Sequence, residues 1–467
     1  MLFNSIEFLI FLPTILILYF AIPSKYRWVL LLLGSYAFYM FWKVEYLVLI
    51  VFSTVLDFFL GKKMGDLSTK KERKPFLIIS LVLNLGVLFT FKYYNFFADS
   101  SSVILDWMNV NKTIPLSDLL LPVGISFYTF QTLSYSIDVY NNKIKPETHL
   151  GHFALFVSFF PQLVAGPIER FSSLSPQLKT NHKFNLEHIK NGFRLILYGL
   201  FIKMVIADNL SVYVDDVYAD SKLFSSGSII TSMFFYSFQI YADFYGYSLI
   251  AIGTAKCLGI SLMDNFRTPY LSKTISEFWQ RWHISLSTWF KDYLYFPMGG
   301  SRVKKSKWMF NIFIVFLASG IWHGANWTFI FWGLLYALLY ISETKLALSN
   351  AIKTNKIVQI LLILKTFIFV SIFWVFFRSQ SISEAFDFFK YMAINTGETF
   401  KTLDVDIFIW GLLLFFIGVD HFLSRERFDV FIQNKPFVFR WMIYTVFISG
   451  ILIFSGVEDY QFIYFQF

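Results

Sequence analysis

The chain has 467 residues, of which 56% are hydrophobic and 15% are charged, and its net charge is +9 at pH 7. A soluble domain carries roughly 25% charged residues, so this composition excludes an ordinary water-soluble fold. The positive charge does not indicate nucleic-acid binding, because the basic residues lie in short loops between apolar runs, as in the cytoplasmic loops of membrane proteins. The single cysteine, Cys257, excludes an internal disulfide and a cysteine metal site.

Apolar runs recur from one end of the chain to the other, which predicts one all-α membrane-embedded domain over residues 1–467. Several runs are shorter than the roughly 20 residues that a membrane-crossing helix needs. Because broken helices are tolerated only where protein or a cavity covers their backbone, we expect about eleven full crossings, with the other runs re-entrant. In chain order, the candidate spans are Ile6–Ala21, Trp28–Phe41, Val44–Leu60, Leu77–Phe91, Leu121–Val139, Phe153–Val164, Phe193–Ile206, Ser228–Ile252, Met309–Ile321, Trp327–Tyr340, Ile357–Phe377, Ile407–Val419 and Trp441–Phe454.

The charges of the connections predict the orientation of the chain. Six basic residues lie in the connection 62–74, and another basic cluster lies at 302–307, so both connections are predicted to be cytoplasmic. The connection 98–120 holds one Lys and three Asp and is predicted to lie outside. Because three spans precede the first basic connection, we expect the N-terminus outside as well.

The densest polar cluster is TISEFWQRWHISLSTWFKDYLYFPMGGSR, residues 274–302. Thr274 and Glu277 have the spacing of a capping box, which predicts a helix that begins there and continues to the Pro297–Gly300 region. Glu277 and Arg281 can pair on one face of this helix. Trp279 and His283 are also four residues apart, on an adjacent face. Either the helix is an interfacial anchor with an aromatic belt, or it lines a cavity.

A second cluster, SGIWHGANW, places His323 at the break between two apolar runs. The neutral form of a histidine is favoured in a dry site, and a neutral imidazole can accept a proton from a hydroxyl, which is the task of a general base. Gly320 and Gly324 would allow another helix or a substrate to come close. The alternative is a core histidine that is hydrogen-bonded to a backbone carbonyl.

Ionisable residues inside spans are costly, which makes each a functional candidate. Asp57, Lys92, Lys203 and Arg378 are interpreted as paired or snorkelling charges near a membrane face. The stretches PQLVAGPIER (161–170) and QIYADFYGYS (239–248) either line a polar cavity or break a helix with satisfied polar groups. No Walker A loop, GxSxG elbow or HExxH motif is present in the sequence, and no metal site is predicted.

The ordered set FWQRWHISLSTWFKDYLYFPMGGSR, GIWHGANW and QIYADFYGYS resembles the membrane-bound O-acyltransferase (MBOAT) family, and PQLVAGPIER and the terminal FIYFQF add to the likeness. The resemblance covers nearly the whole chain. It is strongest to the bacterial branch of alginate O-acetyltransferases and related polysaccharide-acetylating proteins. The GGSR motif favours this branch over the D-alanine transferases of teichoic acid. The family fold implied is a ring of tilted helices around a thin conical core, with re-entrant or interfacial helices.

The resemblance implies catalytic roles for His323, as the base, and His283, which would orient the donor or the imidazole. Substrate-contacting residues would line a tunnel that joins a cytoplasmic donor to an outer acceptor, with Asp243 stabilising a cation or tuning the site. These residues are Trp279, Arg281, Trp322, Asn326, Asp243 and Gln239.

No bound cofactor is expected, and acetyl-CoA or an acyl carrier would be a co-substrate. A multi-pass protein of the bacterial cytoplasmic (inner) membrane is implied, in contact with membrane lipid. A periplasmic or extracellular acetyltransferase partner would complete the transfer to a polysaccharide acceptor. The alternatives are D-alanyl transfer to teichoic acid, peptidoglycan O-acetylation, and a transporter or flippase, for which an inverted repeat would be expected.

Overall fold

The computed structural model describes residues 1–110, 113–164, 166–345, 355–455 and 462–463. Across these ranges the chain is helical, and the single β-feature is an isolated bridge between Phe224 and Lys401. The predicted all-α class is therefore confirmed. The chain divides into two compact units. The boundaries between the units fall within α10 and within α12, so each of these helices begins in one unit and ends in the other.

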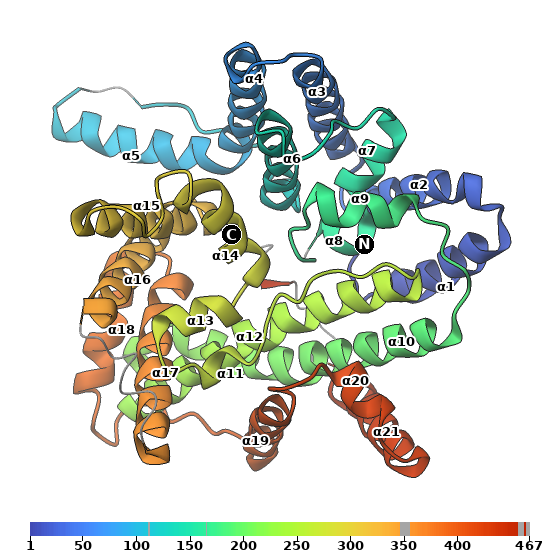
Figure 1. Ribbon diagram of the computed structural model, residues 1–467. Coiled ribbons are helices and arrows are strands. Elements are labelled where there is room, and N and C mark those ends of the chain that lie inside the picture. Colours follow the sequence, from blue (N-terminus) through green and yellow to red (C-terminus); the bar gives the residue numbers. More distant parts are fainter. Residues whose placement is uncertain (111–112, 165, 346–354, 456–461, 464–467) are drawn as a thin grey trace. The chain divides into compact units, whose positions relative to one another are not determined.

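Unit 1 comprises Met1–Ile189 and Thr254–Met263. Within it, α3, α4 and α6 pack together, and α7 packs against both α2 and α9 (Figure 1). The 3-10 turns Ser24–Tyr26 and Val44–Tyr46 and the π-helical turn η3 (Phe89–Tyr93) link its helices. Those helices are α1 (Ile6–Ala21), α2 (Arg27–Met40), α3 (Leu47–Gly65), α4 (Lys70–Leu88), α5 (Tyr94–Trp107), α6 (Ile125–Tyr140), α7 (Leu150–Ser158), α8 (Phe160–Leu163) and α9 (Phe171–Lys179).

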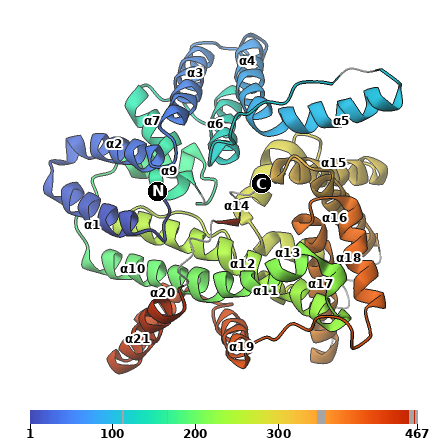
Figure 2. The ribbon, with the colours of Figure 1, turned by 180° about the vertical axis from the view of Figure 1, so that it is seen from behind.

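Unit 2 comprises Lys190–Gly253 and Asp264–Phe467. Here α15 packs along α16, and α16 along α17, as both views show (Figures 1 and 2). The π-helical turns η4 (Ile202–Ala207) and η7 (Lys291–Tyr295) and the 3-10 turns Ser221–Leu223 and Pro269–Leu271 lie between its helices. Those helices are α10 (Leu186–Phe201), α11 (Asp208–Ala219), α12 (Ser226–Cys257), α13 (Ile275–Arg281), α14 (Ile284–Phe290), α15 (Lys305–His323), α16 (Trp327–Lys345), α17 (Lys356–Arg378), α18 (Ile382–Ile394), α19 (Ile407–Phe422), α20 (Phe428–Gln433) and α21 (Phe437–Phe454).

Within the described ranges, five helical stretches are long and apolar enough to cross a membrane, and α1 and α19 are shorter apolar helices. On α21, Leu452 is 77% and Ile453 70% exposed, and exposed apolar residues of this kind are what lipid covers. The chain is therefore a multi-pass membrane protein, while the count of about eleven crossings stays a prediction. The five stretches are Val44–Gly65, Lys70–Trp107, Leu186–Ala219, Lys356–Arg378 and Phe437–Phe454.

The buried charges take two forms in the helices. In unit 1, Asp57 accepts hydrogen bonds from the neutral groups of Ser80, Asn84 and Ser136. In unit 2, Lys203 of the π-helical turn η4 forms an ion pair with Asp243 of α12, with Nζ and Oδ1 2.9 Å apart. A buried lysine thus has a counterion, which offsets the large cost of burying either charge alone.

Candidate active site

His323 is the last residue of α15, at the break that the sequence predicted between two apolar runs. Gly320 allows α15 and α16 to approach each other here, because a Cβ atom at this position would lie 2.3 Å from the carbonyl oxygen of Phe329. Any side chain at residue 320 would push the two helices apart. This glycine therefore fixes the position of the end of α15, and with it the position of His323.

The beginning of α13 agrees with the prediction made from the capping-box spacing. The Thr274 side chain accepts a hydrogen bond from the Glu277 N–H at 3.1 Å. Glu277 in turn pairs with Arg281 one turn later, at 2.6 Å. Both contacts stabilise the first turns of the helix that leads to His283.

The predicted continuation of this helix to the Pro297–Gly300 region is wrong. The helix ends at Arg281, and His283 has a left-handed backbone, with φ of 42°, before α14 begins at Ile284. Trp279 and His283 consequently do not lie on faces of one helix. Such a backbone costs a residue other than glycine about 1–3 kcal/mol and persists only where surrounding contacts hold it.

Asn265 supplies the contacts that hold this break. Its backbone carbonyl accepts the Ile284 N–H at 2.9 Å. Its side-chain Oδ1 accepts hydrogen bonds from the Ser285 hydroxyl at 2.9 Å and from the Ser285 N–H at 3.3 Å. The same Oδ1 lies 3.2 Å from Nδ1 of His283. One buried carboxamide thus fixes both the backbone turn and the imidazole.

These contacts determine which nitrogen of His283 carries the proton. A backbone N–H can only donate, so the Asn265 atom that faces Ser285 is the oxygen and not the nitrogen of the amide. Because that oxygen can only accept, Nδ1 of His283 must donate to it, and Nε2 then carries the basic lone pair. Burial lowers the pKa of His283 to about 3, so the imidazole is neutral near pH 7.

The two predicted catalytic histidines lie together in an aromatic enclosure. Their ring centroids are 6.4 Å apart, and His283 is 0% and His323 2% exposed. Phe244 of α12 meets the His283 ring edge-on at 4.8 Å. Trp332 of α16 and Phe377 of α17 meet the His323 ring at 5.1 and 5.3 Å. The enclosure excludes water, which strengthens every polar interaction inside it.

Two of the predicted tunnel residues pack close to the histidines, and one does not. Trp322 lies edge-on to His283 at 5.7 Å. Trp279 packs on Trp332, with ring centroids 5.7 Å apart, so the Trp332 ring lies between Trp279 and His323. Arg281 instead binds Glu277 and donates to the Thr268 hydroxyl at 3.2 Å.

The remaining predicted residues have structural contacts of their own. Asn326 accepts the Thr328 N–H and donates to the Gln380 carbonyl at 2.7 Å, which orders the turn between α15 and α16. Asp243 binds Lys203 and accepts the Ile463 N–H at 2.7 Å. Gln239 is half-buried one turn before Asp243. The substrate roles of all six predicted contact residues stay predictions.

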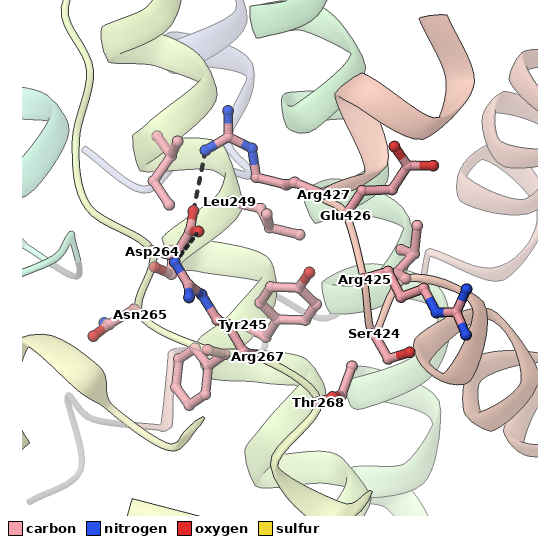
Figure 3. Close-up of a pocket in the computed structure, with 14 residues that line it drawn as sticks. Tyr245, Leu249, Asp264, Asn265, Arg267, Thr268, Ser424, Arg425, Glu426 and Arg427 are labelled. Atoms are coloured by element: carbon pink, nitrogen blue, oxygen red, sulfur yellow. Dashed lines mark hydrogen bonds and ion pairs between the residues drawn. The ribbon is translucent and has the colours of Figure 1, made fainter. Parts of the chain in front are cut away.

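Cavities in unit 2 adjoin the segments that carry the histidines. One, of about 470 Å³, is lined by Ile284 and Leu286, on either side of Ser285, and by Ser319, one turn before His323. Its walls also carry Trp279 and several hydroxyl and amide groups. Another, of about 280 Å³, is lined by Asn265, together with residues of α12 and of the loop 423–427 (Figure 3).

Sequence reasoning missed Asn265 and Ser285. Asn265 lies in an aperiodic stretch between α12 and the capping box of α13, and its partner His283 is 18 residues away in sequence. The only signal in the sequence is that polar residues follow a buried helix where no further span begins. Such a signal does not identify which polar residue meets the histidine.

Comparisons with known proteins show the family to which the chain belongs. A sequence model of the membrane-bound O-acyltransferase family matches residues 147–348, which include both histidines. The chain is 39% identical to the probable alginate O-acetylase of Pseudomonas aeruginosa, over 84% of this chain and 75% of that protein. It is 34% identical to the probable alginate O-acetylase of Pseudomonas putida, over 100% of both chains. It is 37% identical to the peptidoglycan O-acetyltransferase of Helicobacter pylori, over 85% of this chain and 80% of that protein.

Proposed function

The chain belongs to the membrane-bound O-acyltransferase family, and from this premise we propose that it acetylates hydroxyl groups of an exported cell-surface polysaccharide. The acetyl group comes from a cytoplasmic thioester and crosses the membrane in the reaction. The activities for which the relatives are named, alginate and peptidoglycan O-acetylation, support an acetyl group and a carbohydrate acceptor. The observation that carries the proposal is the pair of buried imidazoles, 6.4 Å apart, at the ends of two helices.

In the proposed reaction, His323 accepts the proton of the acceptor hydroxyl as its oxygen attacks the thioester carbonyl. The new C–O bond forms, the C–S bond breaks, and the imidazolium returns the proton to the departing thiolate. His283 orients the donor or the His323 ring, with Nε2 as its basic atom because Asn265 holds the proton on Nδ1. Holding both reactants beside these groups removes much of the entropic cost of bringing them together.

The surrounding residues shape the path of the two substrates. Trp279 lines the cavity of about 470 Å³, where Ser319 and Ser276 supply hydroxyls, and Trp322 packs beside His283. Hydroxyl, amide and aromatic groups together are the usual lining of a site for polar organic ligands. This composition supports a carbohydrate or another hydroxyl-bearing acceptor there.

The protein acts in the cytoplasmic membrane of a bacterium, with the basic connection 302–307 on the inner side. A periplasmic or extracellular acetyltransferase partner acts after this transfer and completes the modification of the polymer. D-alanyl transfer and peptidoglycan O-acetylation differ from this proposal in the group moved or the polymer modified. A transporter would need no buried pair of histidines.

Purified protein in lipid vesicles tests the proposal directly. With [14C]acetyl thioester and short oligosaccharides as acceptor, wild-type protein should yield labelled ester. Loss of a general base costs about 10²–10⁴ in rate, so the His323→Gln variant should transfer at least about a hundredfold more slowly. The matched control is His421→Gln, because His421 is an exposed histidine at the end of α19. Equal rates for His323→Gln and wild type would refute the proposed base.

A further inference from the structure

Polar side chains from three helices of unit 1 gather around a buried carboxylate. The helices are α3, α4 and α6, which pack against one another (Figure 1). Each contributes two polar residues four positions apart, which therefore lie on one face of the helix. All are at most 4% exposed, and neither the proposed acyl transfer nor the two histidines use them. These residues, which we call the carboxylate cluster, are Ser53 and Asp57 of α3, Ser80 and Asn84 of α4, and Thr132 and Ser136 of α6.

The carboxylate of Asp57 lies inside a span without a cationic partner. Its helix belongs to a stretch that is apolar enough to cross a membrane, and Gly65, the last residue of α3, is about 12 Å farther along the helix axis. Asp57 is 0% exposed, and no basic side chain pairs with it among the residues that the structure describes. A charge in such a place is costly, so it requires a counterion and makes the residue a functional candidate.

The neighbours of Asp57 surround it with neutral groups only. Asn84 donates from Nδ2 to Oδ2 of Asp57 and to the Ser80 carbonyl, each at 2.9 Å. Because a carbonyl can only accept, the orientation of this amide is settled, and its Oδ1 accepts the Ser53 hydroxyl. The hydroxyls of Ser80 and Ser136 both contact Oδ1 of Asp57, the latter at 3.0 Å. These groups orient the carboxylate but do not balance its charge.

The oxygens around Asp57 are ligands of the kind that a hard cation binds. A hydroxyl that donates its proton keeps its lone pairs, so Ser80 and Ser136 can bind a cation beside the carboxylate. Thr54 lies three residues before Asp57 on the same side of α3, is 2% exposed, and has a hydroxyl without a hydrogen-bond partner in the described ranges. Oxygen-only surroundings without imidazole or thiolate do not suit zinc or copper. One carboxylate balances a single positive charge, whereas calcium sites commonly use several.

We propose that the carboxylate cluster binds a monovalent metal cation between α3, α4 and α6. Asp57 supplies the negative charge, and the hydroxyls of Ser80, Ser136 and Thr54 supply further oxygens. Because the ligands come from all three helices, the bound ion stabilises their packing in the folded state. The proposal is independent of the acyl transfer, since the cluster belongs to unit 1 and the histidines to unit 2.

Binding of radioactive sodium to the purified full-length protein in detergent is the first measurement. N-methylglucamine chloride, whose cation is too large for the cluster, keeps the ionic strength constant. Asp57→Asn preserves the size of the side chain and removes its charge, so it should bind sodium at least about tenfold more weakly than wild type. The matched control is Asp138→Asn, because Asp138 is another buried aspartate of α6 that pairs with Lys143 outside the cluster. This variant should bind sodium as wild type does.

Thermal unfolding of the same proteins is the second measurement. A ligand that binds only the folded form stabilises it, so exchange of N-methylglucamine for sodium should raise the Tm of wild type by at least about 2 °C, with saturation. Asp57→Asn should unfold at the same temperature in both salts. Ser136→Ala keeps the carboxylate but loses one oxygen, so its half-saturating sodium concentration should rise roughly threefold or more.

Equal Tm values of wild type in the two salts, without saturable sodium binding, overturn the proposal, because the carboxyl group then only joins the helices. A sodium response that persists in Asp57→Asn also overturns it, since the ion then binds elsewhere. If Asp57→Asn does not fold, Ser136→Ala decides. An unchanged half-saturating concentration in that variant contradicts the assigned ligands.

Discussion

At the scale of single residues, the arrangement of the candidate site depends on Asn265. Its Oδ1 lies within 3.3 Å of His283 Nδ1 and of both polar groups of Ser285, so one atom fixes the tautomer of the imidazole and the turn that carries it. A histidine can act as a base only through the nitrogen without a proton. In the proposed reaction, the nitrogen that His283 presents is therefore set by a carboxamide that need not touch either substrate.

We predict that Asn265→Ala lowers kcat more than it raises KM. One neutral hydrogen bond is worth about 1 kcal/mol, so the loss of the contact to His283 should slow transfer roughly fivefold, and the loss of the turn should add to this. Asn265→Asp keeps the acceptor and should recover part of the rate, but its charge raises the pKa of His283 and adds an acid limb to the pH–rate profile. An unchanged pH profile in Asn265→Asp would contradict the contact.

The stability of the folded protein should depend on pH through His283. Burial lowers its pKa to about 3, whereas an unfolded histidine titrates near about 6.5. Between these values the unfolded state binds a proton that the folded state does not, so stability is full above about pH 6.5 and falls as the pH drops below it. The slope is at most about 1.4 kcal/mol per pH unit for one group.

Thermal unfolding in detergent at pH 7.5 and pH 5.5 measures this dependence. Wild type should lose more stability on acidification than His283→Gln, in which the titrating group is absent. Equal losses in the two proteins would mean that His283 is not buried in its neutral form.

At the scale of elements, the sequence predicted most helices and the cap of α13, but it missed the break at His283. Capping boxes and i,i+4 pairs involve neighbours in sequence, so Thr274, Glu277 and Arg281 could be interpreted correctly. The break is held by Asn265, which is distant in sequence, and no local pattern marks a left-handed residue that is not glycine. Likewise, Lys203 and Asp243 were each recognised as costly charges, but their pairing depends on the packing of η4 and α12.

The close packing of α15 and α16 gives a prediction about His323. Gly320→Ala would place a Cβ 2.3 Å from the carbonyl oxygen of Phe329, so it should destabilise the protein by about 1–3 kcal/mol and displace the end of α15. Transfer should fall with it. Gly418→Ala in α19 is the matched control, because no atom lies within 4 Å of its added Cβ, and it should be neutral or slightly stabilising. If both variants behave alike, the hairpin does not position His323.

At the scale of the whole molecule, the fold buries polar side chains in a protein whose helices, such as α21, expose apolar residues. The exposed apolar residues of helices such as α21 require lipid, while His283 and His323 are almost fully buried. The cavities could not be predicted from the sequence, because their walls combine segments as distant as α12 and the loop 423–427.

Asp243 connects α12 to η4 through its ion pair with Lys203, and it connects α12 to residue 463 through the hydrogen bond that it accepts from the Ile463 N–H. Substitution of Asp243 distinguishes a structural role of this residue from a substrate contact. Asp243→Ala should destabilise the protein by about 1–3 kcal/mol, because buried donors lose their acceptor. Asp216→Ala, which removes an exposed ion pair with Lys401, should cost about 1 kcal/mol or less. Both are measured by thermal unfolding. Reduced transfer with unchanged stability in Asp243→Ala would instead support the substrate contact that the sequence predicted.

The most direct test of the account is the ester-linked acyl content of surface polysaccharide and cell wall, measured by mass spectrometry. Cells with wild-type protein, without the protein, and with His323→Ala at matched membrane abundance are compared. The account predicts that one acetyl ester of a surface polysaccharide disappears in both altered strains. An ester that persists in His323→Ala but vanishes without the protein would contradict catalysis by His323, and an ester whose mass is that of D-alanine would contradict acetyl transfer.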